Sequence, residues 1–430
     1  MNFLRLLYPG MHIKRWLLLL MLGVVIISLG FAYILRQIYI YYTFPDFVWY
    51  LTLQFIPRYV RGALFIGGGI ACICMAIWQF YKSLLSALLP AGREDNLVNI
   101  MYNARYLKRG PKVVAIGGGT GLSTLLRGLK GYTGNLTAIV TVADDGGSSG
   151  RLRRELGVLP PGDFRNCIAA LADAEPLMTR LFQYRFGEGS GLEGHSFGNL
   201  FIVAMSGVIG NFEQAIRESS RVLAVRGKIL PSTLANVILC ARMEDEATVQ
   251  GESNITHSGN RIKQVYIEPE NAEAYPEALS ALKEAELIVL GPGSLYTSVL
   301  PNLLVEGISK AIAASNAVKV YVCNVATERG ETDGFNAADH AEALRQHVGG
   351  RLLDYVLVNS NVQAALPPEW GVSIVSPNGQ CPEGVEFVMA DMVSEGNRLR
   401  HDSEKLGSSL MRLYYEKRQG NGRRGGGIRS

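Results

Sequence analysis

Two glycine-rich segments of the sequence suit close contact with phosphate groups. The segment 117–121 (GGGTG) directly follows the apolar run 112–116, and the segment 291–298 (GPGSLYTS) follows the apolar run 287–290. Glycine lets the backbone approach an anion closely, and the free amide groups of a following helix can point at it. The first segment matches neither the dinucleotide fingerprint GxGxxG, because position 122 is Leu, nor a P-loop. Tight turns made only for packing are the alternative.

Three aspartates follow a predicted strand or open a predicted helix. Asp144 and Asp145 come after the apolar run 136–142, where carboxylates can bind ribose hydroxyl groups or hold a divalent cation beside phosphates. Asp163 lies in the segment PPGDFRNC, at the start of a predicted helix. Helix capping is the alternative for these aspartates, and it is compatible with ligand contact. All three are candidate catalytic residues, and Asp144 and Asp163 are the expected metal ligands if the protein uses magnesium.

Other polar residues complete the predicted ligand site. His195 and Asn199 are four residues apart and would share one face of a helix, where a ligand contact suits the histidine better than catalysis. No second histidine at metal-binding spacing supports a zinc site, and His340 and His347 are typical of a helix surface. The predicted ligand-binding residues are Gly117, Gly118, Gly119, Thr120, Gly121, Asp144, Asp163, Asn166, His195, Asn199, Gly291, Gly293, Ser294, Tyr296, Thr297, Asn324, Glu331 and Thr332.

Buried strands are expected to position these residues. The strand candidates are the apolar runs 112–116, 136–142, 287–290, 318–323 and 355–358. Because they alternate with helical patterns, they predict an α/β fold with a wound, mostly parallel sheet. Such a sheet binds ligands beyond the carboxyl ends of its strands, and the glycine-rich and acidic segments all follow such ends. The segment 237–268 has several short β-type runs and is predicted to be a small β insertion.

The N-terminal part of the chain differs from the rest. Residues 17–35 and 63–81 contain no charged side chain, and about 19 helical residues span roughly 28 Å, close to the thickness of a bilayer core. A signal peptide is the alternative for the first stretch, but the run is too long and no small-residue cleavage site follows it. The expected parts of the chain are a two-helix transmembrane hairpin (1–90), a linker (91–110), a nucleotide-binding domain (111–395) and a C-terminal helix with a disordered basic Gly/Arg tail (396–430).

Charge and cysteine content bear on compartment and partners. The net charge is +4, but acidic residues outnumber basic ones between 111 and 415, so nucleic acid is not an expected partner. Six cysteines at unpatterned positions predict neither a disulfide framework nor a zinc site. With the basic residues Arg105, Lys108 and Arg109, they favour a multi-pass protein of the cell (inner) membrane whose main domain lies in the cytoplasm.

Six motifs occur in the order found in one known family. They are GGGTGL at 117–122, TVADDGGSSGRLR at 141–153, PGDFRNC at 161–167, GHSFGNL at 194–200, GPGSLYTSVLPNLL at 291–304 and CNVATERGETDGF at 323–335. Over about 112–360 the chain resembles the bacterial gluconeogenesis factor family, which is related to the 2-phospho-L-lactate transferase superfamily. The resemblance implies a Rossmann-like fold that binds a nucleotide sugar such as UDP-N-acetylglucosamine. It also implies a role in growth on gluconeogenic carbon and in cell shape through wall-precursor supply.

Two classes of function fit these motifs. A regulator that senses a nucleotide sugar needs only phosphate and ribose contacts, whereas a transferase of a phosphate-containing group also needs metal-binding carboxylates and an activated acceptor. The transferase relatives imply magnesium near the transferred group, whereas a regulator needs no cofactor. An NAD-type oxidoreductase is disfavoured by the missing GxGxxG. We expect a binding regulator, with a second copy of the chain and wall-synthesis proteins as further partners, while the base, the sugar and any turnover stay undetermined.

Overall fold

The computed structural model describes residues 13–42, 45–51, 53–88, 107–173, 176–189, 191–350, 352–362 and 370–424. The chain divides into two compact units, Met1–Arg105 and Tyr106–Ser430. Most of the predicted linker over 91–110 and the end of the basic tail lie outside the described residues.

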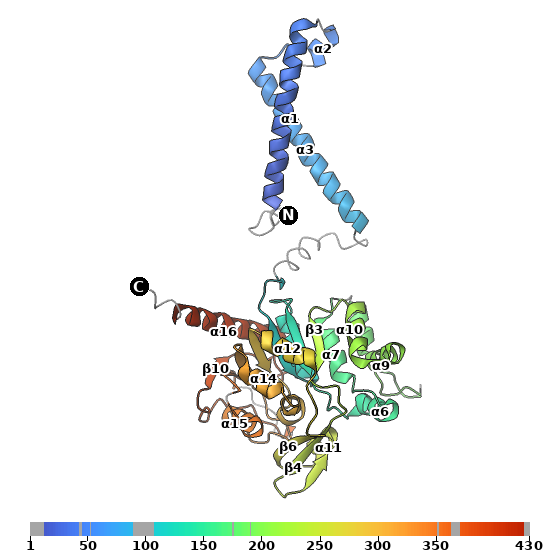
Figure 1. Ribbon diagram of the computed structural model, residues 1–430, viewed down its shortest axis with the longest axis vertical. Coiled ribbons are helices and arrows are strands. Elements are labelled where there is room, and N and C mark those ends of the chain that lie inside the picture. Colours follow the sequence, from blue (N-terminus) through green and yellow to red (C-terminus); the bar gives the residue numbers. More distant parts are fainter. Residues whose placement is uncertain are drawn as a thin grey trace. The chain divides into compact units, whose positions relative to one another are not determined.

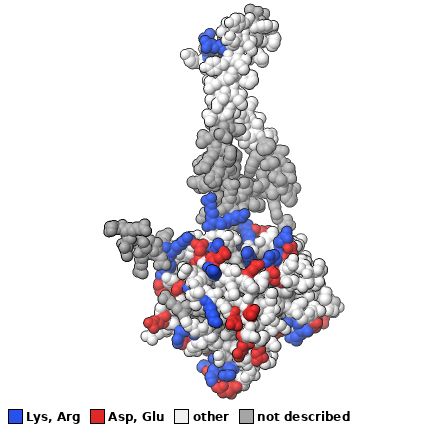
Figure 2. Space-filling model, in the orientation of Figure 1, with Lys and Arg blue, Asp and Glu red and all other residues white. Residues whose placement is uncertain are grey.

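The first unit is helical and apolar where it is described. It contains α1 (Ile13–Tyr41), α2 (Asp46–Leu51) and α3 (Arg58–Leu88) (Figure 1). In α3, the stretch Arg58–Gln79 is long and apolar enough to cross a bilayer, and it is not buried within the unit. The apolar stretch Leu22–Ile38 of α1 is shorter, and hardly any charge is visible on the described part of this unit (Figure 2). Both predicted apolar stretches are therefore helical, and their crossing of a membrane stays a prediction.

The second unit is built on a seven-stranded parallel sheet, which confirms the predicted α/β class. The strand order is β3-β2-β1-β7-β8-β9-β10. The strands are β1 (Val113–Gly117), β2 (Leu136–Val140), β3 (Lys228–Pro231), β7 (Leu287–Leu290), β8 (Val318–Val322), β9 (Tyr355–Asn359) and β10 (Glu386–Ala390). Five of them match the predicted runs, and β3 and β10 form the two edges. The chain order reverses between β1 and β7, which is the switch point where doubly wound sheets bind ligands.

Helices cover the sheet and continue to the end of the described chain. They are α5 (Gly119–Leu129), α6 (Gly147–Leu156), α7 (Gly162–Leu171), α8 (Pro176–Gln183), α9 (Phe197–Ile209), α10 (Phe212–Val222), α12 (Pro276–Glu284), α13 (Leu300–Leu304), α14 (Ile308–Ala314), α15 (Ala337–Val348) and α16 (Ser403–Arg424). Helix α16 packs so closely on α5 that a Cβ at Gly128 would overlap the carbonyl oxygen of Ser403. Leu406 and Leu410 of α16 belong to the main core. The expected domain end at 395 therefore falls inside the second unit.

The segment predicted to be a β insertion forms a second, small sheet. It contains β4 (Ile238–Met243), β5 (Thr248–Gln250) and β6 (Ile262–Glu268), which pair antiparallel in the order β5-β4-β6. Helix α11 (Glu252–His257) lies beside them at one end of the second unit (Figure 1). Leu239 and Ile267 from this sheet join the main hydrophobic core, so the insertion is rigidly attached to the unit.

The predicted position of His340 on a helix surface is wrong. His340 is fully buried in α15, and Nδ1 of its ring lies 2.9 Å from the carbonyl oxygen of Asn336. It falls on the same stripe as Ala337, Ala341 and Leu344, which are spaced as the buried face of an amphipathic helix. The helical spacing alone would have placed His340 on the buried face, but the polarity of histidine suggested an exposed position.

Candidate functional site

A cavity of about 610 Å³ lies at the carboxyl ends of β1, β7 and β8, at the switch point of the sheet. Nine of the predicted ligand residues line it: Gly118, Gly119, Thr120, Gly121, Gly293, Ser294, Thr297, Asn324 and Glu331. Glu252 and Thr256 of α11 and the segment 397–401 complete its walls. Both glycine-rich segments and the loop after β8 therefore meet at one site.

The glycines of the first loop serve two different purposes. A Cβ at Gly118 would lie 2.5 Å from Oδ2 of Asp163, and one at Gly121 would overlap the carbonyl oxygen of Pro292. These two glycines are therefore required for packing. Gly119 has φ +62°, and a Cβ there would meet only Oγ of Ser298, at 3.7 Å. Its surface is open to the cavity, as a ligand contact requires.

The start of α5 has free backbone amide groups that face the cavity. Gly118 is the N-cap residue and supplies no side-chain cap, so the amide groups of the first turn depend on other acceptors. The Gly119 amide donates to the buried carboxylate of Asp163. Thr120 and Gly121 follow it along the cavity wall. The partial positive charge of the helix end and these amides suit a phosphate group.

The second glycine-rich loop is held in place by two asparagines. Oδ1 of Asn324, which follows β8, accepts a hydrogen bond from the Gly293 amide at 3.2 Å. Asn302 is fully buried and donates to the carbonyl oxygens of Gly117, at 3.2 Å, and Ser298, at 2.8 Å. Asn302 thus ties the end of β1 to the π-helical turn Leu295–Val299. Asn302 is not among the predicted site residues, although it lies within the motif 291–304.

An acidic cluster lies behind the first loop. It consists of Asp144, Asp163 and Glu252, of which Glu252 reaches the cavity. Burial and the neighbouring Asp144 raise the pKa of Asp163 to about 7. Burial, Asp144 and Asp163 raise the pKa of Glu252 well above its usual range. Within the described ranges no three such side chains are arranged to hold a metal ion.

Several predicted residues lie outside the cavity lining. They are Gly117, Asp144, Asp145, Asp163, Asn166, His195, Asn199, Gly291, Tyr296 and Thr332. Asp163 is in the first turn of α7, whose N-cap is Pro161, so its side chain does not cap the helix. Oδ1 of Asn166 accepts from the Arg165 guanidinium at 2.9 Å. These residues were predicted because their side chains are polar, but in the structure they contact neighbouring protein groups and do not line the cavity.

His195 and Asn199 meet at a serine and not at the cavity. Oγ of Ser148 lies 3.0 Å from Nδ1 of His195 and 3.0 Å from Nδ2 of Asn199. Because α9 begins at Phe197, His195 precedes the helix. Burial and the nearby Arg151 lower the pKa of His195, so the ring is neutral and can accept from Ser148. The pair braces α9 against α6.

Tyr296 and Thr332 support the loops from behind. The Tyr296 ring is buried and packs edge-on against the rings of Phe335 and His347. Oγ1 of Thr332, which is also buried, accepts a hydrogen bond from the Glu328 amide at 2.9 Å. Both residues therefore position neighbours that line the cavity, and neither lines it.

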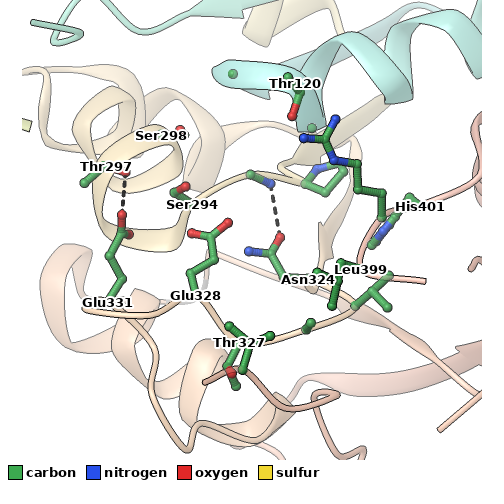
Figure 3. A pocket seen from close by; sticks show the side chains of 18 of the residues that line it. Thr120, Ser294, Thr297, Ser298, Asn324, Thr327, Glu328, Glu331, Leu399 and His401 are labelled. Atoms are coloured by element: carbon green, nitrogen blue, oxygen red, sulfur yellow. Dashed lines mark hydrogen bonds between the residues drawn. The ribbon is translucent and has the colours of Figure 1, made fainter. Parts of the chain in front are cut away.

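One end of the cavity is acidic. Oε1 of Glu331 accepts from Oγ1 of Thr297 at 2.9 Å and from Oγ1 of Thr256 at 3.3 Å. Ser294 donates to the carboxylate of Glu328, which lies next to Glu331 (Figure 3). Burial raises the pKa of both glutamates, and Glu328 raises that of Glu331 further.

Four parts of the cavity lining were not predicted from the sequence: Glu328, Glu252, Thr256 and the segment 397–401. Glu328 lies inside the motif 323–335, four residues after the predicted Asn324, so the motif itself could have pointed to it. The other positions carry no glycine-rich or strand-end signal. Only the folded chain brings α11 and the segment before α16 to the cavity.

The fold and the site define a doubly wound α/β protein with a cavity at the switch point of its sheet. Residues 113–369 match the family described as 2-phospho-L-lactate transferase CofD. The gluconeogenesis factor of Bacillus subtilis is 48% identical over 318 residues, which are 71% of this chain and 99% of that protein. A relative from Nostoc sp. is 46% identical over 94% of this chain and 91% of its own length. The chain therefore belongs to the gluconeogenesis factor family and matches the 2-phospho-L-lactate transferase CofD family as well.

A solved structure agrees with this assignment. The crystal structure of a protein member of the UPF0052 family from Bacillus halodurans is 46% identical to this chain. The match has a TM-score of 0.66 and covers 70% of this chain and 99% of that one. Like the Bacillus subtilis protein, this relative matches over almost its entire length while covering about 70% of the present chain.

Proposed function

We propose that the cavity binds a nucleotide sugar of the UDP-N-acetylglucosamine kind and that the protein is a binding regulator. The observation that carries this proposal is the meeting of two glycine-rich loops at the open end of α5, at the switch point of the sheet. A volume of about 610 Å³ lies within the range of roughly 300–1,000 Å³ typical of small-molecule sites. At the level of the cell, the protein would act in growth on gluconeogenic carbon and in wall-precursor supply.

Binding without turnover is favoured by the histidine in the cavity lining, which is not suited to act as a base, although burial and Glu328 raise the pKa of the lining residue Glu331 to about 7. His401 is the histidine in that lining, and burial lowers its pKa to about 4. Such a ring is neutral at pH 7 and is a weak proton acceptor, whereas catalytic bases have a pKa near the working pH. His195 does not line the cavity and is hydrogen-bonded to Ser148.

A magnesium-dependent transferase of a phosphate-containing group is the second candidate. Two observations favour it: the match to the CofD family and the acidic cluster beside the cavity. Asp144, Asp163 and Glu252 carry the oxygen ligands that Mg²⁺ prefers, but among the described residues they are not arranged to hold the ion, so this candidate requires these side chains to move when magnesium binds.

Calorimetry on the full chain in detergent micelles tests both candidates. Ligands would be UDP-N-acetylglucosamine, UDP-glucose, GDP and NAD, each with and without magnesium. For a regulator we expect one UDP-sugar site per chain and no consumption of the ligand over hours. Magnesium-dependent turnover that Asp163→Asn abolishes, while nucleotide affinity is unchanged, would overturn the regulator in favour of the transferase. Binding of none of these ligands would reject both.

We further propose that the first unit anchors the protein in the cell membrane as a two-helix hairpin, with the second unit in the cytoplasm. A reporter that fluoresces only in the cytoplasm should then be active when fused after Ser430. A thiol reagent that cannot cross membranes should label Tyr50→Cys in intact cells. The exposed Cys72 and Cys74 must first be replaced by serine, because they would supply background. Labelling only after lysis would reject the hairpin.

A further inference from the structure

The acidic end of the cavity has hydrogen-bonding capacity that the protein does not use. Oε2 of Glu328 and Oε2 of Glu331 are both buried, and neither has a hydrogen-bond partner among the described residues. Glu331 is only 6% exposed. Buried carboxylate oxygens are normally satisfied, so an unpartnered pair in the wall of a cavity indicates a missing ligand group.

The chemistry of this end limits what the ligand group can be. When Glu328 and Glu331 are ionised, their carboxylates accept hydrogen bonds and repel a phosphate, so the group must supply donors. The hydroxyl groups around it, from Ser294, Thr297 and Thr256, already donate to the glutamates. The ligand must therefore add donors of its own. A uracil ring offers one N–H between two carbonyl oxygens, and those oxygens would face the carboxylates.

The opposite end of the cavity has a different character. The segment 397–401 lies there and contributes the apolar Leu399 and the neutral ring of His401, together with Asn397 and the cationic Arg400. Figure 3 shows His401 and Leu399 on the far side of Asn324 from Glu331. Thr120, at the phosphate-binding end of α5, lies along the upper wall in the same view. A flat base fits the apolar end, and a polyhydroxyl ring fits the acidic end.

We propose that Glu328 and Glu331 form a sugar subsite, in which their free oxygens accept hydrogen bonds from hydroxyl groups of the sugar half of the ligand. This inference rests on the proposed function, since it assigns the two halves of a nucleotide sugar to the two ends of one cavity. The diphosphate lies at the start of α5, and the base lies at the apolar end. Specificity for the sugar is then set by the loop after β8.

The test compares ligands that differ only in the sugar half. UDP-glucose should bind the full-length protein at least tenfold more tightly than UDP, and analogues lacking one sugar hydroxyl should lose at least tenfold at one or two positions. Sites built to bind a hydroxyl group reject ligands that lack it by such factors or more. These measurements use the unaltered protein, so they do not depend on the folding of a variant.

Variants locate the effect. Glu331→Gln and Glu328→Gln should each reduce UDP-glucose affinity at least fivefold and leave UDP affinity unchanged. The control Glu270→Gln replaces an exposed carboxylate outside the cavity and should alter neither affinity.

The failures can be told apart. If UDP and UDP-glucose bind the unaltered protein equally, the sugar subsite is wrong and nucleotide binding stands. If both glutamine variants lose UDP and UDP-glucose in parallel, the glutamates shape the whole cavity and the subsite is also wrong. If neither ligand binds the unaltered protein, the proposed function itself fails.

Discussion

Replacing Gly121 with alanine is expected to destabilise the second unit by about 3 kcal/mol or more and to abolish ligand binding. A Cβ at this position would overlap the carbonyl oxygen of Pro292, and the backbone atoms of Pro292 and Gly293 in the second loop leave no room for it. One of the two loops must therefore move, and the cavity they form together would change shape. Chemical denaturation of the full chain, combined with calorimetry, measures both effects.

Gly207→Ala is a matched control for this change. Gly207 lies in the interior of α9 and has no atom within 4 Å of where its Cβ would be. Alanine is a better helix former than glycine by about 1 kcal/mol, so this variant should be as stable as the unaltered protein or more so. If the two variants unfold at the same denaturant concentration, the two loops are not packed as closely as the structure has them.

Asp163→Asn is expected to stabilise the unliganded protein at pH 8 by about 2–4 kcal/mol. The pKa of Asp163 is raised to about 7 in the folded state by burial and by Asp144, and each unit corresponds to about 1.4 kcal/mol. A carboxyl group with a raised folded pKa holds its proton more tightly when folded. The contribution of Asp163 to the free energy of unfolding is therefore complete below about pH 4 and is lost as the pH rises to about 7. Asparagine removes this loss and still offers an oxygen to the Gly119 amide.

Thermal unfolding between pH 4 and pH 8 checks this expectation. The unaltered protein should lose stability over that interval. The Asp163→Asn variant should lose about 2–4 kcal/mol less of its free energy of unfolding. Glu270→Gln, an exposed carboxylate, should follow the unaltered protein. An Asp163→Asn variant that is less stable at pH 8, with an unchanged pH slope, would show that the carboxylate is ionised and well compensated in the folded state.

The sheet was predictable from the sequence because its strands are buried on both faces. β1, β7 and β9 read as continuous apolar runs, and buried parallel strands have this pattern. The edge strand β3 contains a lysine and a proline within four residues, and β10 begins with a glutamate and is partly exposed. Edge strands need only one apolar face, so their sequences do not differ enough from loops to be recognised.

The site was predictable where the backbone itself makes the contact. Gly119 and Gly293 stood out because glycine readily takes the positive φ that the backbone has at both positions. Asp163 and His195 stood out by side-chain chemistry, but sequence spacing does not tell which way a side chain points. Asp163 turns toward Gly118, and His195 turns toward Ser148. Long-range packing decided their roles.

The packing of α16 on α5 has a consequence for how the protein is made. Gly128 and Gly407 touch across this contact, and the segment 397–401 just before α16 lines the cavity. A ribosome must therefore release nearly the whole chain before α5 has its final neighbours. Contacts between such distant parts of a chain form slowly, and the uncovered apolar face of α5 is prone to aggregation until then. Premature termination before α16 would thus leave the face of α5 around Gly128 uncovered.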